Sequence, residues 1–185
     1  MTIFQMLRIG LICGSLLGLA SAAAEDVDPD NDDSQYAWAS NLGWINAEPL
    51  GDGGPGMALS AEAATGWLWS ANSGWISLSC ENTGSCDSVD YGVLNNGDGQ
   101  LSGYAWSPNL GWISFSCADS NSCDSVDYGV QVDPVSGEMS GFAWAANAGW
   151  ISFSCADTES CSNVDFGVRL ATAEIIDPIF ADRFQ

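Results

Sequence analysis

A tryptophan-rich segment that recurs four times constrains this chain more than any other feature. Residues 103–117 read GYAWSPNLGWISFSC, and close copies begin at Tyr36, Gly66 and Gly141. The last two intervals between the copies are 37 and 38 residues, and the second tryptophan of each copy falls at Trp44, Trp75, Trp112 and Trp150. A period of this length is typical of a supersecondary unit that buries its apolar face only by stacking on its neighbours.

Each copy has the pattern of a β-hairpin. An aromatic-Ala-Trp run and a Gly-Trp-Ile-Ser run flank a short polar link, which is how two short strands around a turn look in sequence. In SPNLG, Pro108 suits the first central turn position, Asn109 tolerates the left-handed region, and Gly111 can take a positive φ where the second strand begins. We therefore predict four hairpins with antiparallel strands.

Side-chain alternation predicts how these strands are oriented. Along GWISFSC, Ile113, Phe115 and Cys117 fall on one face of the strand and Trp112 on the other. A third run, VDYGVQV from Val126, also alternates and predicts a half-buried strand. The expected fold class is all-β, a tandem repeat of four three-stranded units of about 37 residues. A closed propeller-like or barrel-like ring and an open solenoid stack both fit this pattern.

The ends of the chain differ in composition from the repeats. Residues 1–24 combine Arg8, a short apolar run and small residues before Glu25, which is the pattern of a secretory signal peptide. Residues 25–35, EDVDPDNDDSQ, predict an acidic disordered leader. The disulfide-stapled β-repeat domain is expected over 36–170, followed by a C-terminal tail over 171–185. No membrane span is expected in the mature chain.

The charge of the chain restricts its partners. It has 24 acidic residues against three cations and no histidine, and its formal net charge is −21. Such a chain has almost nothing with which to neutralise phosphate groups. We therefore expect no nucleic acid partner and no attraction to anionic lipid.

Six of the seven cysteines form three Cys-x5-Cys pairs, each at the same place in its repeat. One pair per repeat makes local pairing the simplest of the fifteen connectivities. Disulfides indicate an exported protein that is secreted or held at the cell surface. The expected bridges are Cys80–Cys86, Cys117–Cys123 and Cys155–Cys161.

The tryptophans are the candidate ligand-binding residues. Stacked repeats would align them in two rows, and rows of exposed rings suit polysaccharides or cell-surface components because rings stack on the apolar faces of sugars. The competing interpretation is that the rings pack neighbouring repeats together. The first row is Trp38, Trp69, Trp106 and Trp144, and the second is Trp44, Trp75, Trp112 and Trp150.

Acidic clusters that follow the cysteine loops are the candidate metal site. Carboxylates with loop carbonyls would suit Ca²⁺, which takes several oxygen ligands in irregular geometry. Solvated turn residues are the alternative, and no other cofactor is expected. The candidate ligands are Asp87, Asp90, Asp124, Asp127 and Asp165.

No group in the sequence points to catalysis. There is no histidine, no lysine and no GxSxG, and repeated aspartates do not single out one carboxylate pair. We predict a non-enzymatic structural or adhesive module of unknown oligomeric state. The alternatives are a secreted carboxylate-dependent glycoside hydrolase and a structural spacer without a ligand.

Two segments resemble known sequence groups. GYAWSPNLGWISFSC, GFAWAANAGWISFSC and GWLWSANSGWISLSC resemble the GWAWSxNxGWIxF repeats of secreted bacterial proteins, a group without an assigned activity. The ending IFADRFQ resembles the IFxDGFE ending of exported proteins of Xanthomonas-like gammaproteobacteria, with Arg183 and Gln185 in place of its Gly and Glu. The resemblance implies a Gram-negative source and a sorting tag.

Overall fold

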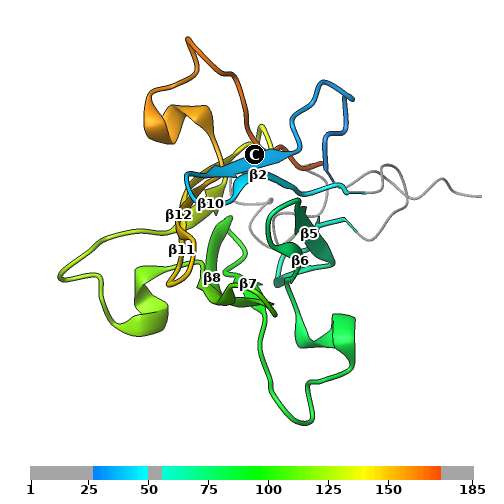
Figure 1. Cartoon of the computed structure of the whole chain (residues 1–185). Coiled ribbons are helices and arrows are strands. Elements are labelled where there is room, and N and C mark those ends of the chain that lie inside the picture. The colour runs from blue at the N-terminus through cyan, green and yellow to red at the C-terminus, as the bar shows by residue number, and fades with distance from the viewer. Residues whose placement is uncertain (1–26, 50–55, 172–185) are drawn as a thin grey trace, which may run out of the picture.

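The computed structural model describes residues 27–49 and 56–171, in which four hairpins close into an antiparallel barrel (Figure 1). The predicted signal peptide and nearly all of the predicted C-terminal tail lie outside these residues. The hairpins are β1 (Tyr36–Ala39) with β2 (Gly43–Asn46), β5 (Trp67–Ser70) with β6 (Gly74–Ser77), β8 (Gln100–Ser107) with β9 (Gly111–Ser114), and β11 (Met139–Ala145) with β12 (Gly149–Ser152).

The ring of strands is closed. Neighbouring hairpins meet at four junctions, where the second strand of one pairs with the first strand of the next: β2–β5, β6–β8, β9–β11 and β12–β1. In the last junction Ser152 lies opposite Trp38, so the fourth repeat pairs with the first. The all-β, barrel-like prediction is confirmed, and the open solenoid alternative is wrong, because the register of β12 brings it alongside β1.

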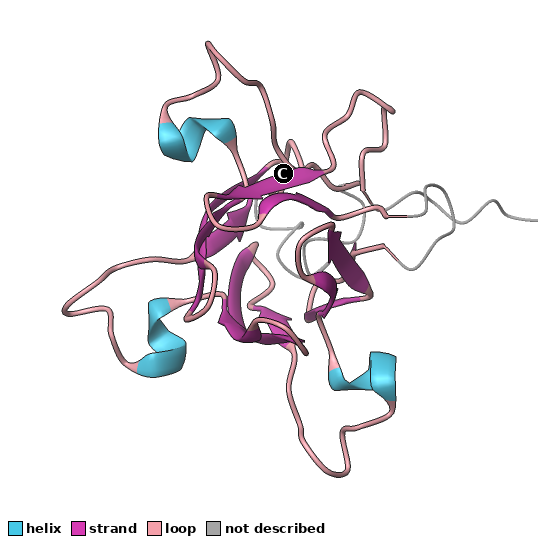
Figure 2. Cartoon of the chain, in the orientation of Figure 1, coloured by secondary structure: helices cyan, strands magenta, loops and turns pink. Residues whose placement is uncertain are grey.

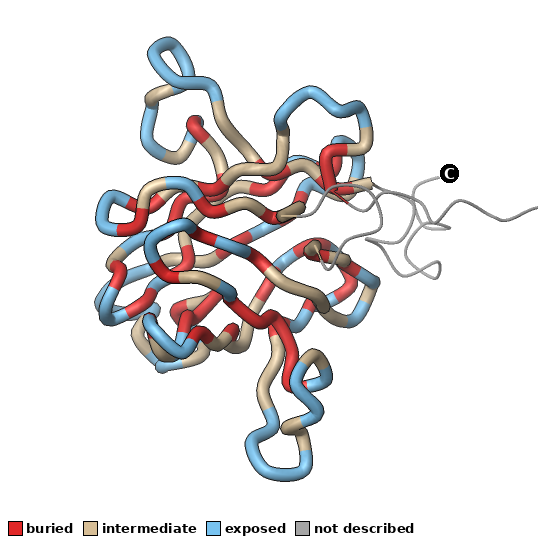
Figure 3. Tube along the Cα trace, turned by 45° about the vertical axis from the view of Figure 1, so that its right-hand side comes forward, coloured by how far each residue is buried: buried red, intermediate tan, exposed pale blue. Residues whose placement is uncertain are grey.

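Small aliphatic side chains fill the barrel. Ile45, Ile76, Ile113 and Ile151 occupy one position in the four hairpins, and each is at most 2% exposed. Barrels of eight strands leave an interior just wide enough for side chains of this kind. The predicted alternation holds, because Ile113 and its strand neighbour Phe115 are buried while Trp112 is exposed. Buried residues accordingly follow the strands, and exposed residues follow the projecting loops (Figure 3).

The hairpin turns do more than reverse the chain. Gly111 has the expected positive φ, 78°, whereas Asn109, which could tolerate the left-handed region, does not adopt it. Its side-chain amide instead donates to the Ser73 carbonyl of the preceding hairpin. The same bond recurs around the ring, from Asn41 to Ala148, Asn72 to Leu42, Asn109 to Ser73 and Asn147 to Leu110, at 2.8–3.1 Å.

The third runs of the first three repeats lie in a second sheet beside the barrel, as β3 (Ala58–Leu59), β7 (Val93–Asn95) and β10 (Val130–Val132). They pair with β4 (Ala63–Thr65) or with the first halves of β8 and β11. The third run of the fourth repeat, predicted over 164–170, makes isolated bridges from Val168, Arg169 and Leu170. The strand predicted from Val126 begins only at Val130, because residues 124–129 belong to the cysteine loop and leave Val126 exposed.

Glycines let β8 and β11 take part in both sheets. Gly103 has a φ of 84°, and a Cβ there would lie 2.2 Å from the Gly92 carbonyl oxygen. Gly141 is placed alike, with a φ of 87° and a Cβ position 2.1 Å from the Gly129 carbonyl oxygen. Any other residue would push the third run away, so these positions require glycine.

The cysteine segments project from the barrel as three disulfide arms, which Figures 1 and 2 show radiating from the strands. Each arm begins with a short 3-10 helix: η1 (Cys80–Thr83), η2 (Cys117–Ser120) or η3 (Cys155–Thr158). The three predicted disulfides are present within their arms. Each cysteine segment is a wide loop, because antiparallel bridges join its two ends, at Ser79–Gly92, Ser116–Gly129 and Ser154–Gly167.

The prediction that residues 25–35 form a disordered leader is wrong for the described residues, 27–35. Val27 bridges to Leu170, and Gln35 bridges to Val168. The buried Asp28 carboxylate accepts hydrogen bonds from the backbone amides of Asp32 and Asp33 at 2.9 and 3.0 Å. Composition alone missed this loop, because its partner strand lies at the opposite end of the repeats.

Candidate functional site

The tryptophans of both predicted rows lie on the outer wall of the barrel. Trp38 and Trp106 are half-buried, and the other six are 38–44% exposed. Each member of the first row lies directly opposite a member of the second row on the neighbouring strand, so the two rows meet as four cross-strand pairs. The barrel interior is filled without them.

Three of these pairs are packed and one is not. The ring centroids of Trp38–Trp44, Trp106–Trp112 and Trp144–Trp150 are each 4.6 Å apart. In the second hairpin, no ring contact joins Trp69 to Trp75, although the two residues are directly opposite. Among the described residues, the ring contact of Trp75 is to Trp67, at 6.0 Å.

Among the described residues, a third aromatic ring packs at three of the four junctions. It comes from the third run of the preceding repeat and meets the second tryptophan of the next hairpin nearly at right angles, an arrangement that aromatic pairs favour. The contacts are Tyr91 with Trp112 at 5.4 Å, Tyr128 with Trp150 at 5.1 Å, and Phe166 with Trp44 at 5.5 Å. The outer tryptophans thus help to join repeats, as the packing interpretation predicts, and still present exposed surface.

The two junction tyrosines also make a polar contact. The Tyr91 hydroxyl donates to Ser77 Oγ at 3.0 Å, and the Tyr128 hydroxyl lies 2.9 Å from Ser114 Oγ. Both serines are the last residues of their hairpins. Each tyrosine therefore places its ring against one repeat and its hydroxyl against the other.

The structure brings only part of the predicted calcium ligands together. Asp90 Oδ1 lies 3.7 Å from Cys80 Sγ, and Asp127 and Asp165 make the equivalent contacts at 3.5 and 3.3 Å. Asp87 and Asp124 do not join these groups. A disulfide sulfur is not a thiolate ligand, and one carboxylate is far short of the six to eight oxygens that Ca²⁺ takes. Calcium binding stays a prediction.

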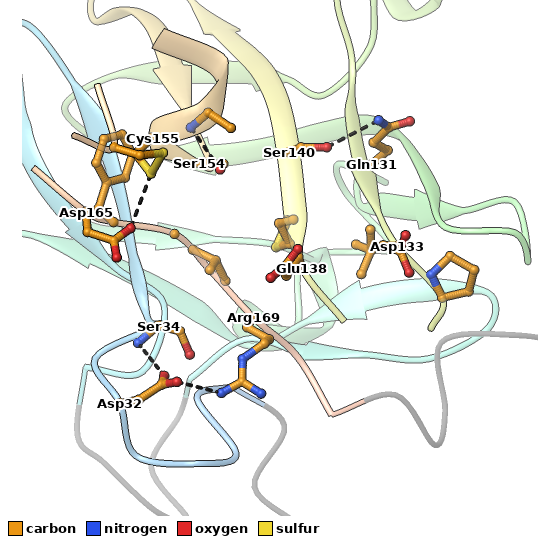
Figure 4. Close-up of a pocket in the computed structure, with 18 of the residues that line it drawn as sticks. Asp32, Ser34, Gln131, Asp133, Glu138, Ser140, Ser154, Cys155, Asp165 and Arg169 are labelled. Atoms are coloured by element: carbon orange, nitrogen blue, oxygen red, sulfur yellow. Dashed lines mark hydrogen bonds and ion pairs between the residues drawn. A yellow bond between two sulfur atoms is a disulfide. The ribbon is translucent and has the colours of Figure 1, made fainter. Parts of the chain in front are cut away.

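A cleft of about 740 Å³ opens on the second sheet (Figure 4). Its floor includes Gln131, which lies opposite both Gln100 and Ser140 and donates to Ser140 Oγ at 3.2 Å. Arg169 is the cationic residue that lines the cleft, and its guanidinium forms ion pairs with Asp30 and Asp32 at 2.6 and 3.0 Å. The carboxylates that line the cleft are Asp32, Asp98, Asp133, Glu138 and Asp165.

Two of these carboxylates are held in the ionised form. Hydrogen bonding by Ser34, with a smaller contribution from Arg169, lowers the pKa of Asp32 to about 2. Backbone amides of Ser136 and Val135 donate to Asp133 and lower its pKa as well. A general acid needs the opposite shift, so neither residue suits that role.

Sequence reasoning missed the cleft and the aspartate that organises the second and the third arm, Asp119 and Asp157. Asp119 accepts hydrogen bonds from the Gly103 amide, Ser114 Oγ, the Phe115 amide and the Ser116 amide at 2.7–3.2 Å. It is the third residue of a capping box, and the Ser-x-x-Asp spacing from Ser116 was the available signal. The cleft has no such signal, because its lining comes from segments distant in sequence.

Comparison of the chain with protein families, with curated proteins and with solved structures found no match. The helices within residues 27–49 and 56–171 have four residues each, and none is long and apolar enough to cross a membrane.

Proposed function

We propose that the mature protein is exported and acts outside the cell as a non-enzymatic module that binds glycans through its outer tryptophans. The observation that carries the proposal is the placement of six tryptophans on the barrel wall at 38–44% exposure. Large apolar rings are seldom repeated on a surface without an interaction to serve. Three arm disulfides and the signal-like N-terminal sequence support export.

The rings are held in fixed orientations, which favours binding. Trp112 contacts Tyr91, Tyr104 and Trp106, and Trp150 is surrounded in the same way. A side chain that is immobilised before binding loses little conformational entropy when a sugar stacks on it. Repetition around the barrel adds avidity, because several weak sites on one rigid body bind a polymer more tightly than one site.

The negative charge of the protein restricts which glycans it could bind. The chain carries a net charge of −21, and Arg169, the cation of the described residues, is already paired with two aspartates. Anionic polysaccharides would be repelled. The proposed ligands are therefore neutral or amino-sugar polymers.

The cleft carboxylates keep a glycoside hydrolase as the rival candidate. Hydrolysis needs one carboxylic acid with a raised pKa beside a second carboxylate. The pKa values of Asp32 and Asp133 are lowered instead. The binding module is the better supported function.

A retention assay tests the proposal. The oxidised mature protein is incubated with insoluble β-1,4-glucan, chitosan and a polygalacturonate gel, with and without EDTA, and released reducing sugar is measured. We expect retention on the first two, no sugar release, and a shift of tryptophan fluorescence with soluble hexasaccharides. Val135→Ala, at an 87% exposed position outside the wall, is the control variant and should bind as the wild type does. Sugar release, or no retention on any matrix, would contradict the proposal.

A further inference from the structure

We infer that each disulfide arm is a thiol–disulfide exchange site of fixed polarity, in which an external thiol attacks the exposed sulfur and an aspartate slows the departure of the buried sulfur. The inference does not depend on glycan binding. It follows from one geometry that recurs three times within the described residues. The sets of outer cysteine, inner cysteine and aspartate are Cys86, Cys80 and Asp90, then Cys123, Cys117 and Asp127, then Cys161, Cys155 and Asp165.

The two sulfurs of each bridge differ in their access to solvent. In the second arm, Cys117 is 4% exposed, whereas its partner Cys123 is exposed. The first and third arms repeat this asymmetry, because Cys80 and Cys155 are also at most 4% exposed. Exchange requires a thiolate to reach the sulfur that it attacks. The outer cysteine of each arm is therefore the point of attack.

The inner cysteine is also fixed to the base of its arm by the backbone. The Cys117 amide donates to the Tyr128 carbonyl at 2.9 Å, and the Cys117 carbonyl accepts from the Ser122 amide at 2.9 Å. None of these bonds involves the disulfide, so the inner sulfur keeps its place when the bridge opens. The equivalent amide bonds, at 3.0 and 2.9 Å, join Cys80 to Tyr91 and Cys155 to Phe166.

One carboxylate contacts the inner sulfur in every arm. Asp127 Oδ1 lies 3.5 Å from Cys117 Sγ, and Asp165 makes the same contact with Cys155 at 3.3 Å (Figure 4). The corresponding distance in the first arm is 3.7 Å. The aspartate that directly follows the outer cysteine in the first two arms is not retained in the third, where Ser162 takes its place. The contacting carboxylate is thus the acidic group that all three sites share.

The exchange step explains what this carboxylate does. A thiolate forms a bond to Cys123 Sγ, the Cys117–Cys123 bond breaks, and its electron pair passes to Cys117 Sγ. Negative charge then develops on a sulfur that lies 3.5 Å from the Asp127 carboxylate, and the two charges repel. The sulfur takes a proton from the solvent and, as a thiol, donates to Asp127 Oδ1. Because the charged leaving group is disfavoured, the arm resists reduction.

The position of the first adduct tests the polarity in the wild type. The oxidised mature protein is treated with glutathione under native conditions, exchange is stopped with acid, and the adducts are located by peptide mass spectrometry. We expect adducts on the outer cysteines to exceed those on the inner cysteines by about tenfold or more, because only the outer sulfurs are accessible. Adducts divided equally between Cys117 and Cys123 would overturn the inference.

Asp127→Asn tests the role of the carboxylate. The reductant is tris(3-hydroxypropyl)phosphine, which is uncharged, so the substitution does not alter its approach electrostatically. It attacks sulfur, expels a thiolate and ends as the phosphine oxide with an oxygen from water. A leaving thiolate that is about tenfold easier to form departs about threefold faster, so the second bridge should be reduced about threefold faster than in the wild type. Alkylation and mass spectrometry measure each bridge separately, and the first and third bridges should keep their rates.

Asp124→Asn is the matched control. Asp124 belongs to the same arm but not to the group formed by Cys117, Cys123 and Asp127, so its substitution removes the same charge without changing the contact. It should leave the reduction rate of the second bridge unchanged. Equal acceleration by both substitutions would reveal a general effect of charge and overturn the role of Asp127. The same conclusion would follow if Asp127→Asn accelerated all three bridges alike or none of them.

Discussion

At the scale of single residues, the four repeats act as internal controls for one another. The last position of the first hairpin strand points into the barrel and is occupied by Ala39, Ser70, Ser107 or Ala145. Ser107 is fully buried, and its Oγ has no hydrogen-bond partner among the described residues. A buried hydroxyl without a partner costs free energy that an alanine at the same position does not.

We therefore expect Ser107→Ala to raise the free energy of unfolding by about 1 kcal/mol. The converse change, Ala145→Ser, should lower it by a similar amount because it buries a new hydroxyl. Urea unfolding followed by tryptophan fluorescence measures both variants. A destabilised Ser107→Ala would show that its hydroxyl makes a contact that this account omits.

The folded loop at residues 27–35 predicts a dependence on pH. The pKa of Asp32 falls from 3.8 to about 2 because Ser34 and Arg169 donate hydrogen bonds to its ionised form. Since the pKa is lower in the folded state, this interaction stabilises the loop above pH 4 and is lost as the pH falls towards 2. Carboxyl chemical shifts from NMR follow the titration directly. Arg169→Gln should raise the pKa of Asp32, because it removes the guanidinium that donates to Asp32 Oδ2. Ser34→Ala keeps the backbone amide that donates to Asp32 Oδ1 and should change the pKa less. An unchanged pKa in Arg169→Gln would contradict the assignment.

At the scale of elements, the second and third disulfide arms each combine a disulfide bond with a helix-capping box. Ser116 and Asp119 form a capping box on η2, and Ser154 and Asp157 do so on η3. The carboxylate of Asp119 also reaches the Gly103 amide, so the arm is bonded back to the barrel strand β8. The arms therefore belong to the outer layer of the barrel at their bases, while their tips project from it (Figure 2).

Removing one staple should weaken the protein without opening the barrel. Cys117→Ser with Cys123→Ser releases a loop of about seven residues, and the chain-entropy model gives a loss of about 2 kcal/mol. Unfolding should remain a single cooperative transition, because the barrel strands do not depend on the arm tip. Asp124→Ala, an exposed change in the same arm, is the control and should leave stability within about 0.5 kcal/mol. A loss of cooperativity in the double variant would contradict this account.

Most elements could be predicted from the sequence, because their signals are local. The alternation of Trp112 and Ile113, the glycine at position 111 and the Cys-x5-Cys spacing each fix geometry within a few residues. The start of the third strand was wrongly predicted at Val126, because the alternation of side chains begins in the cysteine loop. The disulfide, and not strand pairing, sets the path of that loop. The role of Asn109 was missed because its partner, Ser73, belongs to another repeat.

At the scale of the whole molecule, closure joins the two ends of the repeats. Trp38 pairs with Ser152, Asn41 donates to Ala148, and Gln35 bridges to Val168. The sequence could not choose between a ring and a stack, because both use the same hairpins and differ only in whether the first and last copies meet.

The closed ring predicts that the fourth hairpin cannot be removed. A chain ending at residue 137 lacks β11 and β12 and exposes the edges of β1 and β9, so it should have no cooperative unfolding transition. Asn41→Ala, which removes a single turn-to-turn bond, should cost only about 1 kcal/mol and leave cooperativity intact. Thermal unfolding followed by circular dichroism distinguishes the two. A cooperative transition in the truncated chain would show that three repeats suffice.

The pairing of β1 with β12 also sets the order in which the protein can acquire its structure. During synthesis from the amino terminus, Trp38 is made more than a hundred residues before its pairing partner Ser152. The first hairpin therefore lacks one of its two neighbouring strands until the fourth repeat has been made. Contacts this distant in sequence form late, because the intervening loop must be closed before they contribute. If the chain is exported as proposed, it would cross the membrane unfolded, and the barrel would be completed only after the last repeat had arrived on the far side.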